Sequence, residues 1–503
     1  MSLSAWIRSR SGEPTPLPVP LAQLDAWLHL ESAAEQLRSW FGDSLEPLLL
    51  DTRLLVLALD RDVAEIDRLL SKQMNVILHA GELQHLEASW RGLRYLTQAA
   101  EQAPLAKIRV LSVSWGEIAR DIERASDFDR TQLYDRIYTQ EFGTLGGQPF
   151  GLLLGAFEVQ HRPGPDHPTD DVTVLKTLAA IAAAAFAPLV LGAAPQLLEL
   201  TSFHQLGRGF DLRATFQQLE YQRWQAMRAS DDMRFIGLVL PHVLLRLPYY
   251  SGVRSRMDGF QFTETLHASG AEDYLWGNAC FAFGTVVLRA FASYGWFADI
   301  RGAPLDELGG GVVTGLPVAS FATDRAGVAT KPSLDCVLTD TQEQDLADLG
   351  FIALRRGTFT DEPVFYGNYS LQTSARQDRT EADVNARLAR MLQYTLCVSR
   401  FAHHLKMLGR SFIGTTTTAA ECQEALQRWL TSYCEGSDSA SRDIKARYPL
   451  REARVEVKEV PGKSGAYTCV LFLRPHFQLD DIASGFRLTT QLAPAAGAST
   501  DGS

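Results

Sequence analysis

His79, Glu82 and His85 lie within seven residues of one another, and their side chains are of types that ligate metal ions. A zinc-binding helix of the His-Glu-x-x-His type needs two histidines four residues apart on one face. These two histidines are six residues apart, and Gly81 lies between them. We therefore interpret the three side chains as solvated residues at helix ends, and we predict no metal site here.

Other stretches with suggestive residue types also lack part of the motif they resemble. The glycines from Gly309 to Gly315 are not followed by Gly-Lys-Ser/Thr, which predicts a flexible loop and not a phosphate cradle. The glycine clusters at 143–147 and 207–209 do not lie directly between a strand and a helix, so we interpret them as turns. His403 and His404 are adjacent on a predicted helix and point about 100° apart, so at most one of them lines an interface.

The sequence also lacks the usual signs of a nucleophile. No Gly-x-Ser-x-Gly occurs, and no cysteine has a neighbouring feature that marks it as activated. We predict no catalytic residue, no metal and no cofactor, and we expect a protein that is not an enzyme. An α/β enzyme of unknown substrate remains an alternative, which would need convergent titratable groups at the carboxyl ends of its strands. A monomeric binding scaffold is another, and it would have a capped, charged final strand.

Composition narrows the class of protein further. The 503 residues include 48 Lys and Arg against 59 Asp and Glu, a net charge of -11, which argues against nucleic-acid and anionic-membrane binding. Hydrophobic residues make up 46%, enough for a packed core, and the length predicts two to four domains. The six cysteines form no Cys-x-x-Cys pair, which fits a reduced, cytosolic protein. The N-terminus lacks the apolar core of a secretory signal, and we interpret the apolar residues 172–194 as a buried helix and strand.

Two helical segments come first. The prolines at 13–20 favour an extended arm. From Asp60, apolar residues recur at helical spacing, and we predict that they form one buried stripe: Val63, Ile66, Leu70, Met74 and Ile77. After Gly81 a second stripe contains Leu83, Leu86, Trp90 and Leu93, and we expect Trp90 to anchor this helix in the fold.

The pattern then alternates between strands and helices. We predict strands at 107–113, 150–157, 188–193 and 235–240, with a capping box from Ser114 to Glu117, a helix after Asp171 and a helix through Phe216 and Trp224. This repetition predicts an α/β fold with a largely parallel sheet covered by helices.

The last part of the chain is predicted to be helical and then β. Loops or an insertion occupy 251–271 and 302–334, and long helices span 274–296 and 385–413. A second capping box runs from Thr418 to Glu421, and strands at 454–460 and 466–473 flank a turn. The face of residues 447–458 is either solvated or docked on another subunit. A final strand, Arg487 to Leu492, has no obvious local partner, and pairing with another chain would satisfy its backbone.

Five segments in order resemble one family, the large subunit of the bacterial type VI secretion contractile sheath. They are ILHAGELQHLEASWRGLRYL (77–96), YLWGNACFAF (274–283), VSRFAHHLK (398–406), KARYPLREARVEV (445–457) and FLRPHFQLDDI (472–482). The resemblance extends from about residue 60 to residue 492. It implies a tail-sheath-like fold, a mixed sheet covered by helices with extended terminal arms.

The resemblance also implies a structural function in the bacterial cytoplasm. The chain would pair with a small sheath subunit, polymerise with further copies of itself around an inner tube protein above a baseplate, and contract to propel the tube. An ATPase would dismantle the contracted form indirectly, through the small subunit. We expect no nucleic-acid partner and no membrane insertion.

On this basis we divide the chain into five parts. Residues 1–59 form an arm or adaptor, 60–100 a helical segment for small-subunit pairing, 101–380 the α/β body, 381–485 an inner domain of helices and a hairpin, and 486–503 an exchanged strand and tail. The expected assembly residues are Leu86, Trp90, Arg91, Leu93, Arg474, His476, Phe477, Arg487, Leu488, Thr489 and Leu492.

Overall fold

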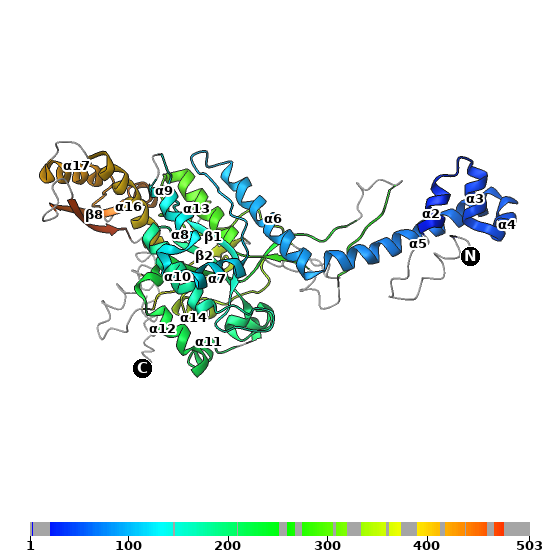
Figure 1. The fold of residues 1–503 in the computed structure, drawn as a ribbon, viewed down its shortest axis with the longest axis horizontal. Helices are drawn as coiled ribbons and strands as arrows, with labels where there is room; N and C mark the ends of the chain where they lie inside the picture. The colour runs from blue at the N-terminus through cyan, green and yellow to red at the C-terminus, as the bar shows by residue number, and fades with distance from the viewer. Residues whose placement is uncertain are drawn as a thin grey trace, which may run out of the picture. The chain divides into compact units, whose positions relative to one another are not determined.

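A computed structural model of the chain describes residues 3, 21–143, 146–208, 210–250, 259–266, 274–304, 308–318, 333–358, 362–373, 390–412, 418–437, 439–459 and 467–476 (Figure 1). The chain divides into two compact units, one of residues 1–87 with 246–275 and one of residues 88–245 with 276–503. Of the expected N-terminal arm, residues 21–59 are described and are largely helical, whereas the proline-rich stretch at 13–20 and the strand at 487–492 lie outside the described residues.

The first unit is mainly helical. Its described helices are α2 (Leu21–Leu28), α3 (Ala33–Phe41), α4 (Leu45–Leu49), α5 (Thr52–Leu78) and the start of α6 (Gly81–Ala100). The rings of Trp27 and Trp40 lie 5.1 Å apart, and Trp40 Nε1 donates a hydrogen bond to the buried Asp62 on α5. The side chain of Asp51 accepts a hydrogen bond from Arg53 N and caps the start of α5. The aromatic pair thus joins α2 to α3, and the hydrogen bond from Trp40 joins α3 to α5.

The second unit is built on a five-stranded mixed sheet in the order β1-β2-β3-β6-β7. The strands β1 (Leu153–Val159), β2 (Leu189–Ala193), β3 (Ile236–Leu240) and β6 (Phe351–Arg356) are parallel, and β7 (Pro363–Phe365) is antiparallel. A separate two-stranded sheet pairs β4 (Val243–Arg246) with β5 (Leu275–Gly277). The predicted α/β fold is therefore confirmed.

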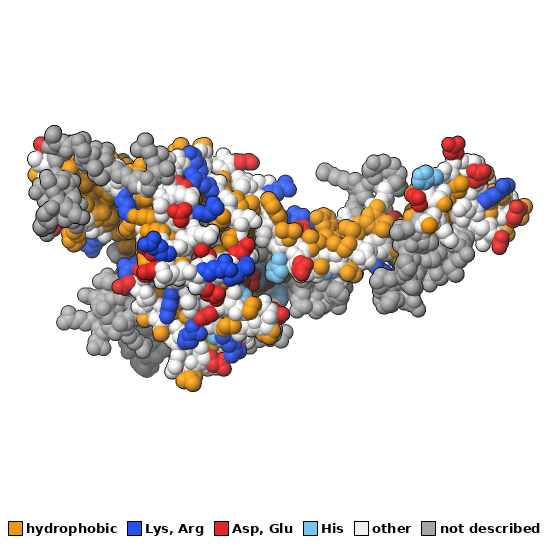
Figure 2. Space-filling model, in the orientation of Figure 1, with side chains coloured by type: hydrophobic (Ala, Val, Ile, Leu, Met, Phe, Trp, Pro, Cys, Tyr) orange, Lys and Arg blue, Asp and Glu red, His pale blue; other side chains and the backbone are white. Residues whose placement is uncertain are grey.

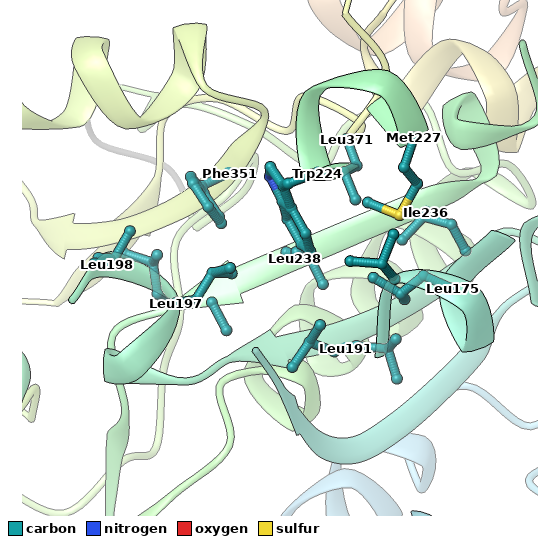
Figure 3. Close-up of a cluster of buried hydrophobic side chains, with 14 of the residues drawn as sticks. Leu175, Leu191, Leu197, Leu198, Trp224, Met227, Ile236, Leu238, Phe351 and Leu371 are labelled. Atoms are coloured by element: carbon teal, nitrogen blue, oxygen red, sulfur yellow. The ribbon is translucent and has the colours of Figure 1, made fainter. Parts of the chain in front are cut away.

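Helices cover both faces of the main sheet. On one face, α7 (Trp115–Arg124), α10 (Asp171–Ala185), α12 (Gln222–Arg228) and α14 (Asp340–Asp348) share a core with the strands. Figure 3 shows the core side chains Trp224, Leu238 and Phe351 close together. On the other face, α13 (Cys280–Tyr294) lies against Leu154 of β1, and α16 (Leu392–Phe412) begins beside Gly237 of β3. Shorter helices, α8 (Gln132–Tyr134), α9 (Gln140–Gly143) and α11 (Leu212–Phe216), join these elements.

A second core follows the sheet in the chain. The helices α16 and α17 (Ala419–Thr431) pack with a hairpin of β8 (Leu450–Glu459) and β9 (Tyr467–Pro475), with α18 (Arg442–Arg447) leading into β8. The buried side chains of this core include Trp296, Phe401, Leu430 and Val455, and the rings of Trp296 and Phe401 are stacked 4.3 Å apart. The predicted hairpin is confirmed.

Several local predictions are also confirmed. Ser114 and Thr418 form capping boxes with Glu117 and Glu421 at the starts of α7 and α17. The segment 172–194 forms α10 and β2. None of the described helices combines the length and the apolar character that a membrane crossing needs.

Three predictions of secondary structure are wrong in part. Residues 107–113 form no strand, since none of the described strands pairs with them, and Val110 and Leu111 are exposed. The predicted helix at 274–296 begins with β5, since Asn278 Oδ1 accepts a hydrogen bond from Cys280 N and starts α13 there. The predicted helix through Phe216 and Trp224 is divided into α11, a 3-10 turn and α12.

Candidate assembly surfaces

The apolar stripe of α5 is exposed in the described structure, where the sequence predicted that it is buried. Val63, Leu70 and Ile77 keep 55%, 46% and 44% of their surface exposed, and Met74 keeps 37%. Figure 2 shows hydrophobic atoms along α5. The helical period was correct, but no described part of the chain covers this face. A row of large apolar side chains that faces water is typical of a surface that another protein covers.

Trp90 and Leu86 of α6 are also exposed, at 66% and 56%. The prediction that Trp90 anchors the helix in the fold is therefore wrong. Gly92 and Leu96 form the buried face of α6, and a Cβ atom at Gly92 would overlap the ring of Phe281 on α13. A bare glycine lets the two helices approach closely, and the exposed Trp90 is left on a different face.

The other two predicted residues of α6, Arg91 and Leu93, are half-buried. The sequence analysis missed Gly92 as the packing residue. A glycine in the interior of a strong helical pattern was the available signal, because it weakens a helix unless a close approach requires it.

His79 belongs to a buried charge cluster in the first unit. Its Nε2 lies 3.1 Å from Glu264 Oε1, and Arg246 contacts both Glu264 and Glu87 at 2.5 Å and 3.0 Å. Burial would raise the pKa of Glu264, but hydrogen bonds from Arg246 and from Tyr249 N hold that pKa below its usual value. The interpretation of His79 as a solvated residue is wrong, whereas Glu82 and His85 are exposed as predicted.

A second charge cluster lies at the carboxyl ends of β1 and β3. His242 Nδ1 lies 2.8 Å from Asp335, and His242 Nε2 lies 2.8 Å from Glu158. Burial opposes the charged ring, yet the two carboxylates raise the pKa of His242 well above its ordinary value. Both ring nitrogens are occupied by carboxylates, so the imidazole is arranged as a fixed cation and not as a base that accepts a proton from a substrate.

A third cluster brings His161, Glu199 and Glu220 together, with one donor atom from each within 4.8 Å of the others. Arg162 contacts Glu220 at 2.5 Å and Glu199 at 3.0 Å. The His161 ring is stacked on Tyr221, with centroids 4.3 Å apart. The single guanidinium pairs with both carboxylates and offsets one of their two negative charges, so a metal ion would have to compete with it.

His403 is buried in the second unit, whereas its neighbour His404 is exposed. His403 Nε2 contacts the carbonyl of Ala185 at 2.9 Å, and burial lowers the pKa of this ring to about 4. His404 packs near the rings of Trp296 and Trp429. The two adjacent rings therefore lie in different surroundings: His403 packs in the interior, and His404 lies at the surface beside two aromatic rings.

The hairpin carries the remaining described assembly residues. Arg474 is exposed on β9, and His476 is buried, with its N–H donating to the Pro449 carbonyl at 3.0 Å. Burial lowers the pKa of His476. The other predicted residues, Phe477, Arg487, Leu488, Thr489 and Leu492, lie outside the described residues.

Two glutamines of α17 contact β8 in a way that the sequence analysis missed. Gln427 Oε1 accepts from Val455 N at 3.0 Å, and Gln427 Nε2 donates to the Ala453 carbonyl at 2.9 Å. Gln423 Oε1 accepts from Val457 N at 3.0 Å. The sequence showed only that the two glutamines, four residues apart, share one helix face, and this did not indicate that they contact β8.

Two family models and one curated relative match most of the chain. Residues 60–372 match the family described as EvpB/VC_A0108, tail sheath N-terminal domain, and residues 381–492 match EvpB/VC_A0108, tail sheath gpW/gp25-like domain. The Type VI secretion system sheath protein TssC1 of Pseudomonas aeruginosa is 35% identical over 468 residues, which cover 92% of this chain and 92% of that protein.

Two solved structures of the anti-feeding prophage are also similar. Its baseplate matches with a TM-score of 0.36 at 11% identity, covering 74% of this chain and 80% of that chain. Its helical sheath in the contracted state matches with a TM-score of 0.32 at 12% identity, covering 63% and 65%. On the strength of the two family matches and the 35% identical relative, the chain belongs to the EvpB/VC_A0108 tail sheath family.

Proposed function

We propose that this chain is the large subunit of a type VI secretion sheath in the bacterial cytoplasm. It pairs with a small sheath subunit, polymerises helically around an inner tube protein from a baseplate, and contracts to propel the tube. It acts without catalysis, and a disassembly ATPase reaches it through the small subunit. Family membership supports the structural role, and the uncovered stripe of α5 is the observation that carries the pairing.

The parts of the chain have different roles in this proposal. Residues 60–100 pair with the small subunit, 101–380 form the body, 381–485 form the inner domain and 486–503 supply an exchanged strand. Residues 1–59 act as an adaptor. The stripe on α5 recurs at helical spacing over about two heptads from Val63 to Ile77, and such a row of apolar side chains can receive another helix.

Charged substitutions on α5 test the pairing. Leu70→Glu places a carboxylate in the stripe, and we expect co-purification with the small subunit to fall strongly, because a buried unpaired charge is costly. Val76→Glu is the matched control, since Val76 is 68% exposed but lies off the stripe. Equal co-purification of both variants with the small subunit would contradict the pairing role of the stripe.

The exposed Trp90 gives a second test of pairing. We expect Trp90→Ala to weaken co-purification while the melting temperature of the chain alone changes little, since the side chain is exposed there. Unchanged co-purification would remove Trp90 from the pairing surface.

Deletion of residues 486–503 tests polymerisation. We expect a folded chain that still binds the small subunit but forms no long tubes in electron micrographs. Normal tubes from this truncation would reject the exchanged strand.

A further inference from the structure

His161, Glu199 and Glu220 come from three segments that meet at the carboxyl end of the main sheet. His161 follows β1 by two residues, Glu199 follows the 3-10 turn Pro195–Leu198 after β2, and Glu220 lies in the 3-10 turn Leu219–Tyr221 before α12. One donor atom from each of the three side chains lies within 4.8 Å of the others. Ligands of open α/β folds usually bind at this edge of the sheet.

The imidazole of His161 is buried and held in a fixed orientation. Its side chain keeps 1% of its surface exposed, and neither ring nitrogen has a hydrogen-bond partner among the described residues. Nε2 lies 3.1 Å from Glu199 Oε1, but the two groups are not aligned for a hydrogen bond. The ring is stacked on Tyr221, whose Oη donates to the Leu197 carbonyl at 2.9 Å. Buried polar groups nearly always have a partner, so this ring indicates a ligand that it can bind.

The charges around the ring favour a cation. Burial lowers the pKa of His161, so the ring is neutral at neutral pH, which is the form that binds metal ions. Glu199 and Glu220 carry two negative charges, and Arg162 offsets one of them. The Arg162 side chain is 53% exposed and reaches the carboxylates from solvent, so it can move back into water at little cost. A divalent cation in its place would neutralise both carboxylates.

We propose that His161, Glu199 and Glu220 bind a divalent transition-metal ion of the zinc type, which displaces the guanidinium of Arg162. One imidazole nitrogen and two carboxylate oxygens are ligands that zinc accepts, with water in the fourth position. Bonds of about 2.0–2.2 Å separate tetrahedral ligand atoms by about 3.4 Å, so the two exposed glutamates turn inward while His161 stays fixed. The ion would join the ends of β1 and β2 to the turn before α12. This inference goes beyond the proposed function and does not depend on pairing or polymerisation.

A second group of charges in the same unit provides a matched control. Arg213 contacts Asp345 at 2.7 Å and Asp348 at 2.9 Å, so one guanidinium again bridges two carboxylates. The Arg213 side chain is 56% exposed, close to the value for Arg162. No described histidine joins this group within ligand distance. The two arrangements therefore differ chiefly in the imidazole.

Zinc titration of the tag-free, full-length chain tests the site after treatment with a chelator. Isothermal titration calorimetry measures the affinity, and circular dichroism measures the melting temperature with and without zinc. We expect zinc to raise the melting temperature of the wild type. His161→Gln should weaken zinc binding by about tenfold or more, since even residues that only orient a metal ligand contribute that much. Glu199→Gln and Glu220→Gln should do the same, and these exposed side chains can be changed without disturbing the core.

Arg162→Gln gives a test in the opposite direction. This substitution removes the cation that competes with zinc, so we expect zinc to bind about twofold to thirtyfold more tightly, the equivalent of two exposed ion pairs. Loss of packing alone cannot produce such a gain. Arg213→Gln should leave the zinc affinity unchanged, because Asp345 and Asp348 lack the imidazole ligand. Magnesium should not replace zinc, since imidazole is a poor ligand for magnesium.

Several results would overturn the metal site. Equal zinc affinity in the wild type and His161→Gln would leave water as the partner of the ring. Weaker zinc binding by Arg162→Gln, or an equal gain from Arg213→Gln, would show that the guanidinium does not compete for a specific site. Equal binding of magnesium and zinc would reduce the group to a cluster of acidic residues. If His161→Gln does not fold, the two glutamate variants decide the question, and unchanged affinity in both rejects the site.

Discussion

Gly92 offers a quantitative test of how α6 packs on α13. A Cβ atom built at this glycine would lie within 3.0 Å of three ring atoms of Phe281, a distance that real Cβ atoms essentially never show. Phe281 is buried and cannot move aside freely. Gly92→Ala should gain about 1 kcal/mol of helix propensity and lose about 1–3 kcal/mol to overpacking.

Gly116→Ala is the matched control, because Gly116 lies in α7 of the same unit and nothing lies within 4 Å of its Cβ position. The two alanine variants should therefore differ by about 1–3 kcal/mol, which corresponds to a few degrees in melting temperature. Thermal unfolding of each full-length variant, followed by circular dichroism, measures this difference. Phe281→Leu should reduce the penalty at Gly92 in a double-mutant cycle. If Gly92→Ala melted at or above Gly116→Ala, the close approach of the two helices would be refuted.

Three further substitutions test other parts of the second unit. The pKa of His242 is raised on folding, so the charged ring stabilises the fold fully below pH 6.5, and this stabilisation is lost as the pH rises through the folded pKa. In urea titrations across pH, His242→Gln should abolish this fall in the free energy of unfolding. Burial lowers the pKa of His403 to about 4, so the free energy of unfolding should fall as the pH drops from 6.5 toward 4. His403→Gln should reduce this pH dependence, and an unchanged dependence would contradict the burial of the neutral ring. Ser114→Ala removes the cap of α7 and should cost about 1 kcal/mol, against no measurable change for Ser126→Ala, an exposed serine in a bend that caps no helix.

Predictions from local patterns were confirmed where the local signal and its partners lie close in the chain. The capping boxes at Ser114 and Thr418 involve residues three apart, so their geometry follows from the sequence. The buried strand β2 follows α10 directly in the chain, and β1, α10 and β2 form one strand-helix-strand unit with parallel strands. Such units have one favoured handedness. The hairpin of β8 and β9 is likewise formed by neighbouring segments.

Predictions that depended on distant partners were less successful. Residues 107–113 had a strand-like pattern, but a strand also needs a neighbour to form a ladder. The stripe on α5 had the right period, but periodicity cannot show whether the covering surface belongs to the same chain. Trp90 was assigned to the core by its size, although Gly92 forms the contact with α13.

The sequence by itself determined the α/β class, the order of the main elements and, through five ordered segments, the resemblance to a sheath subunit. These features depend on composition, local periodicity and motifs, all of which are properties of the chain in one dimension. Only the tertiary structure decided that the stripe of α5 is uncovered, that His242 lies between Glu158 and Asp335, and that Gln423 and Gln427 close the edge of β8. The reason is physical: burial, charge pairing and strand-edge satisfaction depend on which distant residues meet, and one residue's type does not specify its neighbours in space.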